Sequence, residues 1–388
     1  WADLLAPAIA LAERGGEVDL SLQDYFASAA YRERVAATPA LAEIFGAPGK
    51  RVLGARMPQH ALAASLRQIA ELGAAALYTG PLGSTLVDDL AAQGALLTME
   101  DLRRHTTRIE PAPAVDFHGR RLHFAPPNSQ GLALGLLAGL WDILRHRPEA
   151  AGGLDPALYL RIKRLAFKYR DRHAVDPQRS ALPADLLEPE RLKLMLDEES
   201  SLLDVEARSG GGDTSTFVIM DRWGNAVSWV QSLFEDFGSG VLSPRTGIVM
   251  HDRLYVESLD ADSVHRLTPG QRPFHTLCPA LLLSGGACEM AIATPGDHGQ
   301  PQSIFQVLVN VFERGQNLQA AIEAPRMRHD NGRDVMIESR VPAPWRDAIR
   351  ACGFELQDVG AWSRLMGGVN AVQRGPDGVF WSGADPRR

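Results

Sequence analysis

The stretch GGGDTSTFVIMD, residues 210–221, places a threonine where a glycine run enters a strand-forming segment. The three glycines have wide access to positive φ and little intrinsic shape. Residues 217–220 are rich in strand formers. Residues 221–225 predict a turn, and residues 226–230 predict the returning strand. The pattern therefore predicts a β-hairpin with the hydroxyl of Thr214 at its entrance.

The Asp213–Thr214 peptide bond is where this pattern indicates chemistry. If the bond is cut, Thr214 becomes an N-terminal residue whose free α-amine lies beside its own hydroxyl, as in threonine N-terminal nucleophiles. An α-amine has a pKa of about 7.7–8.0, so it can accept the hydroxyl proton near pH 7. The alternative is that the segment is a loop without chemistry, because short motifs also match by chance.

Further motifs carry a resemblance to a known family. They are DTST (213–216), DRWGNAV (221–227), FGSG (237–240), RPFHT (272–276), TPGD (294–297) and GADPR (383–387). With these motifs in this order, the chain resembles the gamma-glutamyltranspeptidase family of self-processing N-terminal nucleophile hydrolases over nearly its whole length. The versions RPFHT and PGDHGQP (295–301) are similar to those of oxamate amidohydrolase and acylase-like members.

The resemblance implies an α+β fold, a four-layer αββα sandwich. It implies a zymogen that cleaves itself into a helix-rich piece, residues 1–213, and a β-rich piece, residues 214–388. The first piece corresponds to the C-terminal part of the large (alpha) subunit, and the second is the small (beta) subunit. The two would together form one sandwich domain and remain a heterodimer, or a dimer of such heterodimers. Family precursors begin upstream of Trp1, so we expect an N-terminal part to be missing, and the compartment cannot be inferred.

Composition excludes several classes of function. The net charge of −7 argues against a nucleic-acid surface, which needs a basic patch. No apolar run of about 18 residues predicts a membrane span. The three cysteines form no C-x-x-C pair, and the histidine and aspartate spacings fit no metal site, so we expect no disulfide framework, metal or cofactor.

Hydrophobic periodicity predicts the elements. We expect helices over 3–14, 23–38, 58–75, 82–93, 132–144, 156–173, 183–197, 301–314, 318–324 and 345–352. We expect hairpins over 115–124, 216–234, 279–293 and 370–381, a helix capped by Thr98, and a linker over 198–212. The basic face of helix 156–173, with Lys163, Lys168, Arg170 and Arg172, is expected to be solvated. The family has a turn similar to residues 126–131 near its active site.

The candidate catalytic residues surround Thr214. We expect its Oγ to attack the carbonyl carbon of Asp213 during cleavage, and later to be the nucleophile, with its own amine as the base. Thr216 faces the same side of the strand two residues on and would orient it, unless it is an ordinary strand threonine. The resemblance implies that Ser232 hydrogen-bonds the nucleophile.

The turn 294–299 is the candidate oxyanion hole, which needs backbone N–H groups aimed at one point. Where the family has two glycines after the proline, this chain has Gly296 and Asp297. A backbone donor survives that change, but the Asp297 side chain adds bulk and charge.

The substrate pocket departs from the family pattern. The family holds an α-amine with Asn, Gln and Asp, where this chain has Phe234, Arg253 and Val256, so a buried ammonium would lack acceptors. The family's two serines for the α-carboxylate are His275 and Thr276 here, which still donate. The family's carboxylate-binding arginine is expected in the missing part.

The predicted function is hydrolysis of a small carboxylate-bearing amide, such as oxamate or a glutaryl amide, through a threonine ester. In the alternative, Arg253 and His275 only pack, and Glu235, Asp236 or Glu257 binds the amine, giving a γ-glutamyltransferase or glutathione hydrolase. A third hypothesis, from another class, is an unprocessed homologue that binds a partner without catalysis.

Overall fold

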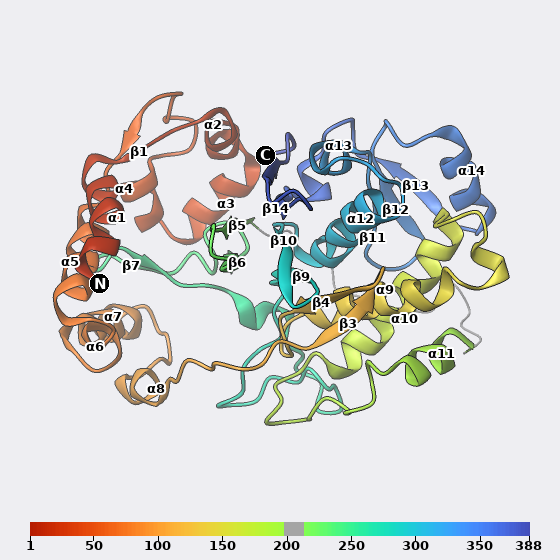
Figure 1. Ribbon diagram of the computed structural model, residues 1–388. Helices are drawn as coiled ribbons and strands as arrows, with labels where there is room; N and C mark the ends of the chain where they lie inside the picture. The colour runs from red at the N-terminus through yellow and green to blue at the C-terminus, as the bar shows by residue number, and fades with distance from the viewer. Residues whose placement is uncertain (198–212) are drawn as a thin grey trace. The chain divides into compact units, whose positions relative to one another are not determined.

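The computed structural model describes residues 1–197 and 213–388, which form two compact units (Figure 1). The first unit combines residues 1–109 with 237–252, and the second combines residues 110–236 with 253–388. The predicted linker 198–212 lies outside the described residues. The unit boundaries do not coincide with the predicted cleavage position, because residues 237–252 leave the second unit and join the first.

The first unit is mainly helical. Phe237 anchors the later segment to the earlier helices, since its ring lies 5.7 Å from the ring of Tyr25 and 4.6 Å from that of Phe45. The helices are α1 (Ala2–Arg14), α2 (Leu20–Ala27), α3 (Ala29–Ala37), α4 (Ala40–Phe45), α5 (His60–Leu72), α6 (Ala75–Tyr78), α7 (Pro81–Ala91) and α8 (Met99–Arg104). The short strands are β1 (Gly16–Glu17), β2 (Arg56–Met57), β7 (Leu242–Ser243) and β8 (Ile248–Val249).

Helix caps explain where this unit agrees with and departs from the predictions. The single helix predicted over 23–38 is wrong. Ser28 is extended, and its Oγ accepts a hydrogen bond from the Tyr31 N–H at 3.1 Å, so α2 ends and α3 begins there. The cap at Thr98 is confirmed, because Thr98 and Asp101 exchange side-chain to backbone hydrogen bonds.

A six-stranded antiparallel sheet is the centre of the second unit. Its order is β15 (Phe380–Ala384), β14 (Asn370–Arg374), β10 (Ala287–Ala293), β9 (Ala280–Ser284), β4 (Arg120–Phe124) and β3 (Ala114–Phe117). Three predicted hairpins are confirmed as β3–β4, β9–β10 and β14–β15. Strands far apart in the sequence meet where β4 pairs with β9.

Helices cover one face of this sheet. Leu122, Leu282 and Ile292 share a buried core with the helices α9 (Gly131–Leu144), α10 (Pro156–His173) and α12 (Gln300–Phe312). Figure 1 shows these helices grouped beside β3, β4 and β9. Because side chains alternate along a strand, Ala291 and Ala293 face the other side.

A second β layer packs on that other side. It is the predicted hairpin, formed by β5 (Asp213–Met220) and β6 (Ala226–Phe234), and it contacts β10 and β14. Ser228 Oγ bonds it to the sheet, donating to the Ile292 carbonyl at 2.8 Å and accepting from the Ala280 N–H at 3.2 Å. On the outer face, Phe217 and Trp229 are 45% and 50% exposed. The helix layer, sheet and hairpin form the layered α+β arrangement that was predicted.

Smaller elements complete the second unit. The strands β11 (Met327–His329), β12 (Asp334–Ile337) and β13 (Glu355–Asp358) form a separate sheet. The helices are α11 (Pro189–Asp197), α13 (Leu318–Glu323) and α14 (Ala343–Ala351), with 3-10 turns at Pro148–Ala150, Arg253–Val256, Asp297–Gly299 and Arg364–Met366. The helix predicted over 183–197 is therefore shorter, beginning at Pro189.

The solvated basic face predicted for α10 is wrong in part. Lys163 and Arg170 are fully or almost fully buried, and only Arg172 of the four basic residues is exposed. Arg170 lies over the Phe167 ring at 3.9 Å, and Lys163 donates to the Asp330 carbonyl at 2.8 Å. Both side chains have polar and aromatic partners inside the second unit, which a charge pattern in the sequence cannot reveal.

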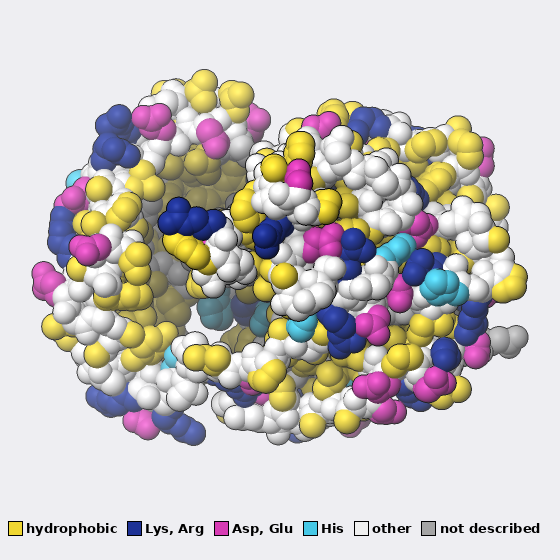
Figure 2. Space-filling view, viewed as in Figure 1, with side chains coloured by type: hydrophobic (Ala, Val, Ile, Leu, Met, Phe, Trp, Pro, Cys, Tyr) yellow, Lys and Arg dark blue, Asp and Glu magenta, His cyan; other side chains and the backbone are white. Residues whose placement is uncertain are grey.

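The surface carries charges of both signs. Figure 2 shows basic and acidic side chains interspersed over the visible face of the second unit. No helix in the described ranges has the length and apolar character needed to cross a bilayer.

Candidate active site

Thr214 lies in the second position of β5, at the hairpin end, and is 8% exposed. Its cross-strand partner is Ser232, and the next pair is Asp213 with Phe234, so Leu233 is the extra residue of a β-bulge. A bulge bends the strand and re-aims side chains beside it. The bulge thus falls at the predicted cleavage site.

Ser232 and Phe234 shape the bulge. Ser232 Oγ accepts a hydrogen bond from the Phe234 N–H at 2.8 Å. Phe234 has φ 84°, a left-handed conformation that a bulky residue rarely adopts, and it is buried. The Ser232 hydroxyl, opposite Thr214, therefore holds a strained backbone at Phe234, which lies opposite Asp213.

Thr216 ties the same strand to the six-stranded sheet. Its Oγ1 accepts a hydrogen bond from Asn370 Nδ2 at 3.0 Å. Asn370 pairs with Ala293, the residue before Thr294. Thr216 therefore shares the inner face of β5 with Thr214, as predicted from the strand period, and links that face to the candidate oxyanion turn.

The turn at Gly296 and Asp297 has positive φ at both residues, 123° and 51°. Gly296 needs to be glycine, because a Cβ there would be strained and would lie 3.2 Å from the Gly367 Cα. Asp297 is 2% exposed, and its carbonyl accepts a hydrogen bond from Gln130 Nε2 at 2.6 Å. The turn is thus buried and held by a side chain of the segment 126–131.

His298 follows the turn and is neutral. Its Nδ1 lies 3.1 Å from Arg170 Nη1, so Nδ1 is the acceptor. Burial, with the charge of Arg170, lowers the pKa of His298 to about 3. Its ring stacks on Phe274 at 6.2 Å. An imidazole in this position orders the turn without adding positive charge at neutral pH.

The predicted pocket residues meet around Arg253. Arg253 is 6% exposed, its Nη1 donates to Thr276 Oγ1 at 3.1 Å, and its guanidinium lies 4.9 Å from the centre of the Phe234 ring. Burial and the nearby charge of Arg253 lower the pKa of His275 to about 4. Glu257, one of the alternative amine acceptors, accepts from the Phe274 N–H at 2.9 Å.

Strand pairing, side-chain contacts and chain connections join the predicted site residues, apart from Asp213 and His275, into one ring. From Thr214 the contacts run through Ser232, Phe234, Arg253 and Thr276 to Gln130, whose Nε2 also binds the Thr276 carbonyl at 2.5 Å. Gln130 leads to Asp297 and Gly296, and the chain returns through Thr294, Ala293 and Asn370 to Thr216. The contact of longest range in this ring joins Gln130 and Asp297, which lie 167 positions apart in sequence.

Sequence reasoning missed Gln130 and Asn370. The turn 126–131 had been singled out as a whole, but its Gln130 had no pattern of its own. Asn370 sits in a strand that was predicted only as one half of a hairpin. A contact between elements far apart in the sequence leaves no local signal.

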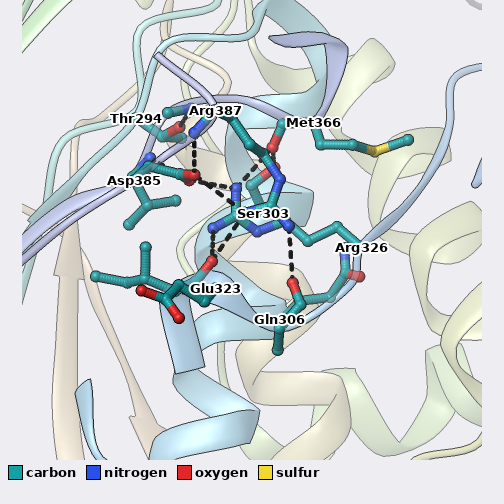
Figure 3. Close-up of polar contacts among 12 residues, drawn as sticks. Thr294, Ser303, Gln306, Glu323, Arg326, Met366, Asp385 and Arg387 are labelled. Atoms are coloured by element: carbon teal, nitrogen blue, oxygen red, sulfur yellow. Dashed lines mark hydrogen bonds and ion pairs between the residues drawn. The ribbon is translucent and has the colours of Figure 1, made fainter. Parts of the chain in front are cut away.

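A buried ionic cluster of Arg326, Arg387, Asp385 and Glu338 lies next to the candidate site and connects to Thr294 (Figure 3). Asp385 binds Arg326 at 2.7 Å and Arg387 at 3.0 Å, and Glu338 takes two bonds from Arg387 at 2.7 Å each. Arg326 Nη1 also donates to the Met366 carbonyl at 2.9 Å. Two residues further on, the Gly368 N–H donates to Thr294 Oγ1 at 3.0 Å. The C-terminal residues are thereby linked to Thr294, in the turn 294–299 that is the candidate oxyanion hole.

Two other kinds of site were sought in residues 1–197 and 213–388. No group of three His, Cys, Asp or Glu side chains there could hold a metal ion, and the three cysteines are free thiols. A cavity of about 760 Å³ is lined by Arg314, Met327 and Trp345 among others, and no predicted site residue is among them.

Comparisons with known proteins identify the family of the chain. The model of the gamma-glutamyltranspeptidase family matches residues 1–388. The chain is 33% identical to the glutathione hydrolase-like YwrD proenzyme of Bacillus subtilis, covering 100% of this chain and 75% of that protein. It is 32% identical to the oxamate amidohydrolase proenzyme of Klebsiella pneumoniae, covering 100% and 74%.

A solved structure shows the fold. The cephalosporin acylase from Bacillus halodurans is 29% identical, covers 100% of this chain with 73% of its own, and superposes with a TM-score of 0.88. The predicted α+β sandwich of the N-terminal nucleophile type is therefore confirmed. By sequence and by fold, the chain belongs to the gamma-glutamyltranspeptidase family of self-processing hydrolases.

Proposed function

We propose that this hydrolase cuts itself before Thr214 and then hydrolyses a small amide whose acyl group carries a carboxylate and no α-amine. The observation that carries the proposal is the ring of contacts that joins Thr214 to the buried Arg253. Oxamate and glutaryl amides are the substrate classes that fit. The likeness to an oxamate amidohydrolase supports the choice.

The chemistry follows from the position of Thr214. Its amine accepts the hydroxyl proton as Oγ attacks the amide carbon, and the backbone N–H groups at Gly296 and Asp297 receive the oxyanion. The C–N bond then breaks, and the leaving nitrogen takes that proton. Water attacks the resulting ester, which releases the acid and restores the hydroxyl. Thr216 and Ser232 orient the strand end during both steps.

The substrate preference follows from the charge around Arg253. Its guanidinium bonds the neutral hydroxyl of Thr276, and His275 is neutral near pH 7 because its pKa is lowered to about 4. A carboxylate would gain charge-assisted hydrogen bonds from Arg253, whereas an ammonium would meet a like charge. Thr276 and His275 complete the donor set for the carboxylate.

The first test is cleavage of the full-length protein. Mass spectrometry should find a fragment that begins at Thr214, and Thr214→Ala should stay whole and inactive. A Thr214→Ala variant with normal turnover would end the proposal. If the wild-type protein stays whole while its fold is intact, the non-catalytic binding homologue is the better hypothesis.

The second test is a panel of amides on the processed enzyme. Oxamate and glutaryl amides should be turned over faster than a γ-glutamyl anilide. Arg253→Gln should raise KM for the carboxylate amides about tenfold to a hundredfold with little change in kcat, because a hydrogen bond to a charged group is worth about 1.5–3 kcal/mol. A dominant γ-glutamyl rate would instead favour a γ-glutamyltransferase or glutathione hydrolase.

A further inference from the structure

We propose that Arg328 is a positioning residue for the candidate oxyanion turn, acting on the direction of the Asp297 N–H; the inference rests on the function proposed above. Arg328 lies in β11 and is 6% exposed. Its Nη1 donates to the Gly296 carbonyl at 3.2 Å and to the Leu365 carbonyl at 3.0 Å. Its Nη2 lies 3.8 Å from Asp297 Oδ2.

Asp330 fixes the orientation of this guanidinium. Arg328 Nε lies 2.8 Å from Asp330 Oδ1, and Nη2 lies 2.7 Å from Oδ2, so the pair is a two-pronged contact. Burial alone would raise the pKa of Asp330, but the charge and hydrogen bonds of Arg328 lower it to about 2. Asp330 is therefore an anion at every working pH and aligns Arg328.

Lys163 anchors the far end of this pair. Its Nζ donates to the Asp330 carbonyl at 2.8 Å and lies 3.1 Å from His329 Nδ1. The other ring nitrogen of His329 contacts the Gly332 carbonyl at 3.1 Å, so Nδ1 is the acceptor for Lys163. The backbone of β11 is thus fixed from α10, and Arg328 extends from a rigid base.

The planarity of the peptide group means that a contact to a carbonyl also fixes the direction of the following N–H. A peptide group is planar and trans, so its C=O and N–H point in opposite directions. Arg328 holds the Gly296 carbonyl and thereby sets the direction of the Asp297 N–H. Gln130 holds the Asp297 carbonyl and sets the direction of the His298 N–H. Arg328 therefore aims the Asp297 donor, and Gln130 fixes the next peptide of the same turn.

The turn needs such support because of its backbone. Asp297 has φ 51°, a conformation that non-glycine residues keep only when their surroundings fix it. The Gly296 carbonyl also accepts a hydrogen bond from the Gly299 N–H at 2.8 Å, so losing the Arg328 contact removes one of its two holds and lets the Asp297 N–H turn away from the forming oxyanion. A displacement of about 1 Å at a reacting centre can lower a rate about a hundredfold.

The experiment compares Arg328→Lys with a matched control. Lysine keeps the positive charge beside Asp330 but lacks the planar fork that reaches Gly296 and Leu365. The control is Arg120→Lys, which breaks a similar two-pronged pair with Glu289 in the same unit, at 2.7 and 3.1 Å. Each processed variant is assayed for kcat, KM and melting temperature, with Thr214→Ala as the blank. Affinity for a boronic-acid analogue of the best acyl group is also measured.

Arg328→Lys should lower kcat about tenfold to a hundredfold, with KM within about threefold of wild type. The affinity of the boronate, which places an oxygen in the oxyanion position, should fall in parallel with kcat. Arg120→Lys should keep kcat and boronate affinity within about twofold of wild type, even if its melting temperature falls as much as that of Arg328→Lys.

The outcomes separate this inference from the proposed function. If Thr214→Ala is inactive while Arg328→Lys keeps the kcat and boronate affinity of the control, Arg328 is structural only and the inference is wrong. If Thr214→Ala turns over substrate, the proposed function itself fails. If Arg328→Lys does not fold, Asp330→Asn is tested in its place. Asp330→Asn should lower both kcat and boronate affinity by at least about threefold. If neither value changes, the inference is wrong.

Discussion

Asn370 Nδ2 donates a hydrogen bond to Thr216 Oγ1 at 3.0 Å, and this bond connects the strand that begins with the candidate nucleophile to the central sheet. Thr216→Val keeps the shape of the side chain and removes the acceptor. We expect about a tenfold fall in kcat and slower self-cleavage, because the strand end loses its register with the turn at Gly296. Stopped-assay kinetics and a time course of cleavage measure both. Thr216→Ser should behave like wild type; equal kinetics for the valine variant would contradict the role.

Ser232 supports the strained residue Phe234. Ser232→Ala leaves the Phe234 N–H without its 2.8 Å acceptor while φ remains at 84°. The free energy of unfolding should fall by about 1–3 kcal/mol, the usual cost of an unsatisfied buried donor. Urea unfolding gives the value. The adjacent Gln231→Ala, at an exposed position of the same strand, serves as the control and should change stability by about 0.5 kcal/mol or less.

Asp385 neutralises two buried arginines. Asp385→Ala leaves Arg326 without the carboxylate that binds it at 2.7 Å and leaves Arg387 with Glu338 as its carboxylate partner. We expect a loss of about 3–5 kcal/mol in the free energy of unfolding, because removing one partner strands a buried charge. Asp347→Ala breaks an exposed pair with Arg350 and should cost about 1 kcal/mol or less. Similar losses for the two variants would show that the cluster contributes no more than a surface pair.

His298 makes stability depend on pH. Burial and Arg170 lower its pKa from 6.5 to about 3 in the folded protein. Between those values the unfolded chain binds the extra proton, so the free energy of unfolding rises with pH, and this contribution is lost as pH falls from 6.5. His298→Asn should reduce the slope between pH 4 and 6 by about 1.4 kcal/mol per pH unit. Urea midpoints at several pH values test it, and an unchanged slope would place the titration elsewhere.

Local patterns predicted the parts of the fold that local forces determine. The hairpins β9–β10 and β14–β15 are pairs of short strand-forming runs joined by glycine-containing turns, so composition and turn chemistry identify them. The cap at Thr98 was likewise visible because both of its partners lie within four residues. The strands β11 and β13 were missed, since they are short and carry charged or polar side chains.

The candidate site was predictable only as separate pieces. Thr214 and the turn at Gly296 each lie in a recognisable motif, and the family resemblance pointed to Ser232, but Gln130 and Arg328 act through contacts made across the fold. The charged residues on α10 were predicted to be solvated because helical spacing does not show which other elements cover the helix. The sequence around Arg328 and Asp330, which are two residues apart, does not indicate that the Arg328 guanidinium contacts Gly296.

The pairing of β4 with β9 has a consequence for the severed protein. β4 precedes the predicted cleavage site in the sequence and β9 follows it. Each fragment would therefore contribute strands to the same sheet and side chains to the same core. Hydrolysis before Thr214 would create a new N-terminus while the two fragments stay bound to each other. The two polypeptides should elute together under native conditions, separate only in denaturant, and fail to assemble properly when each is made without the other.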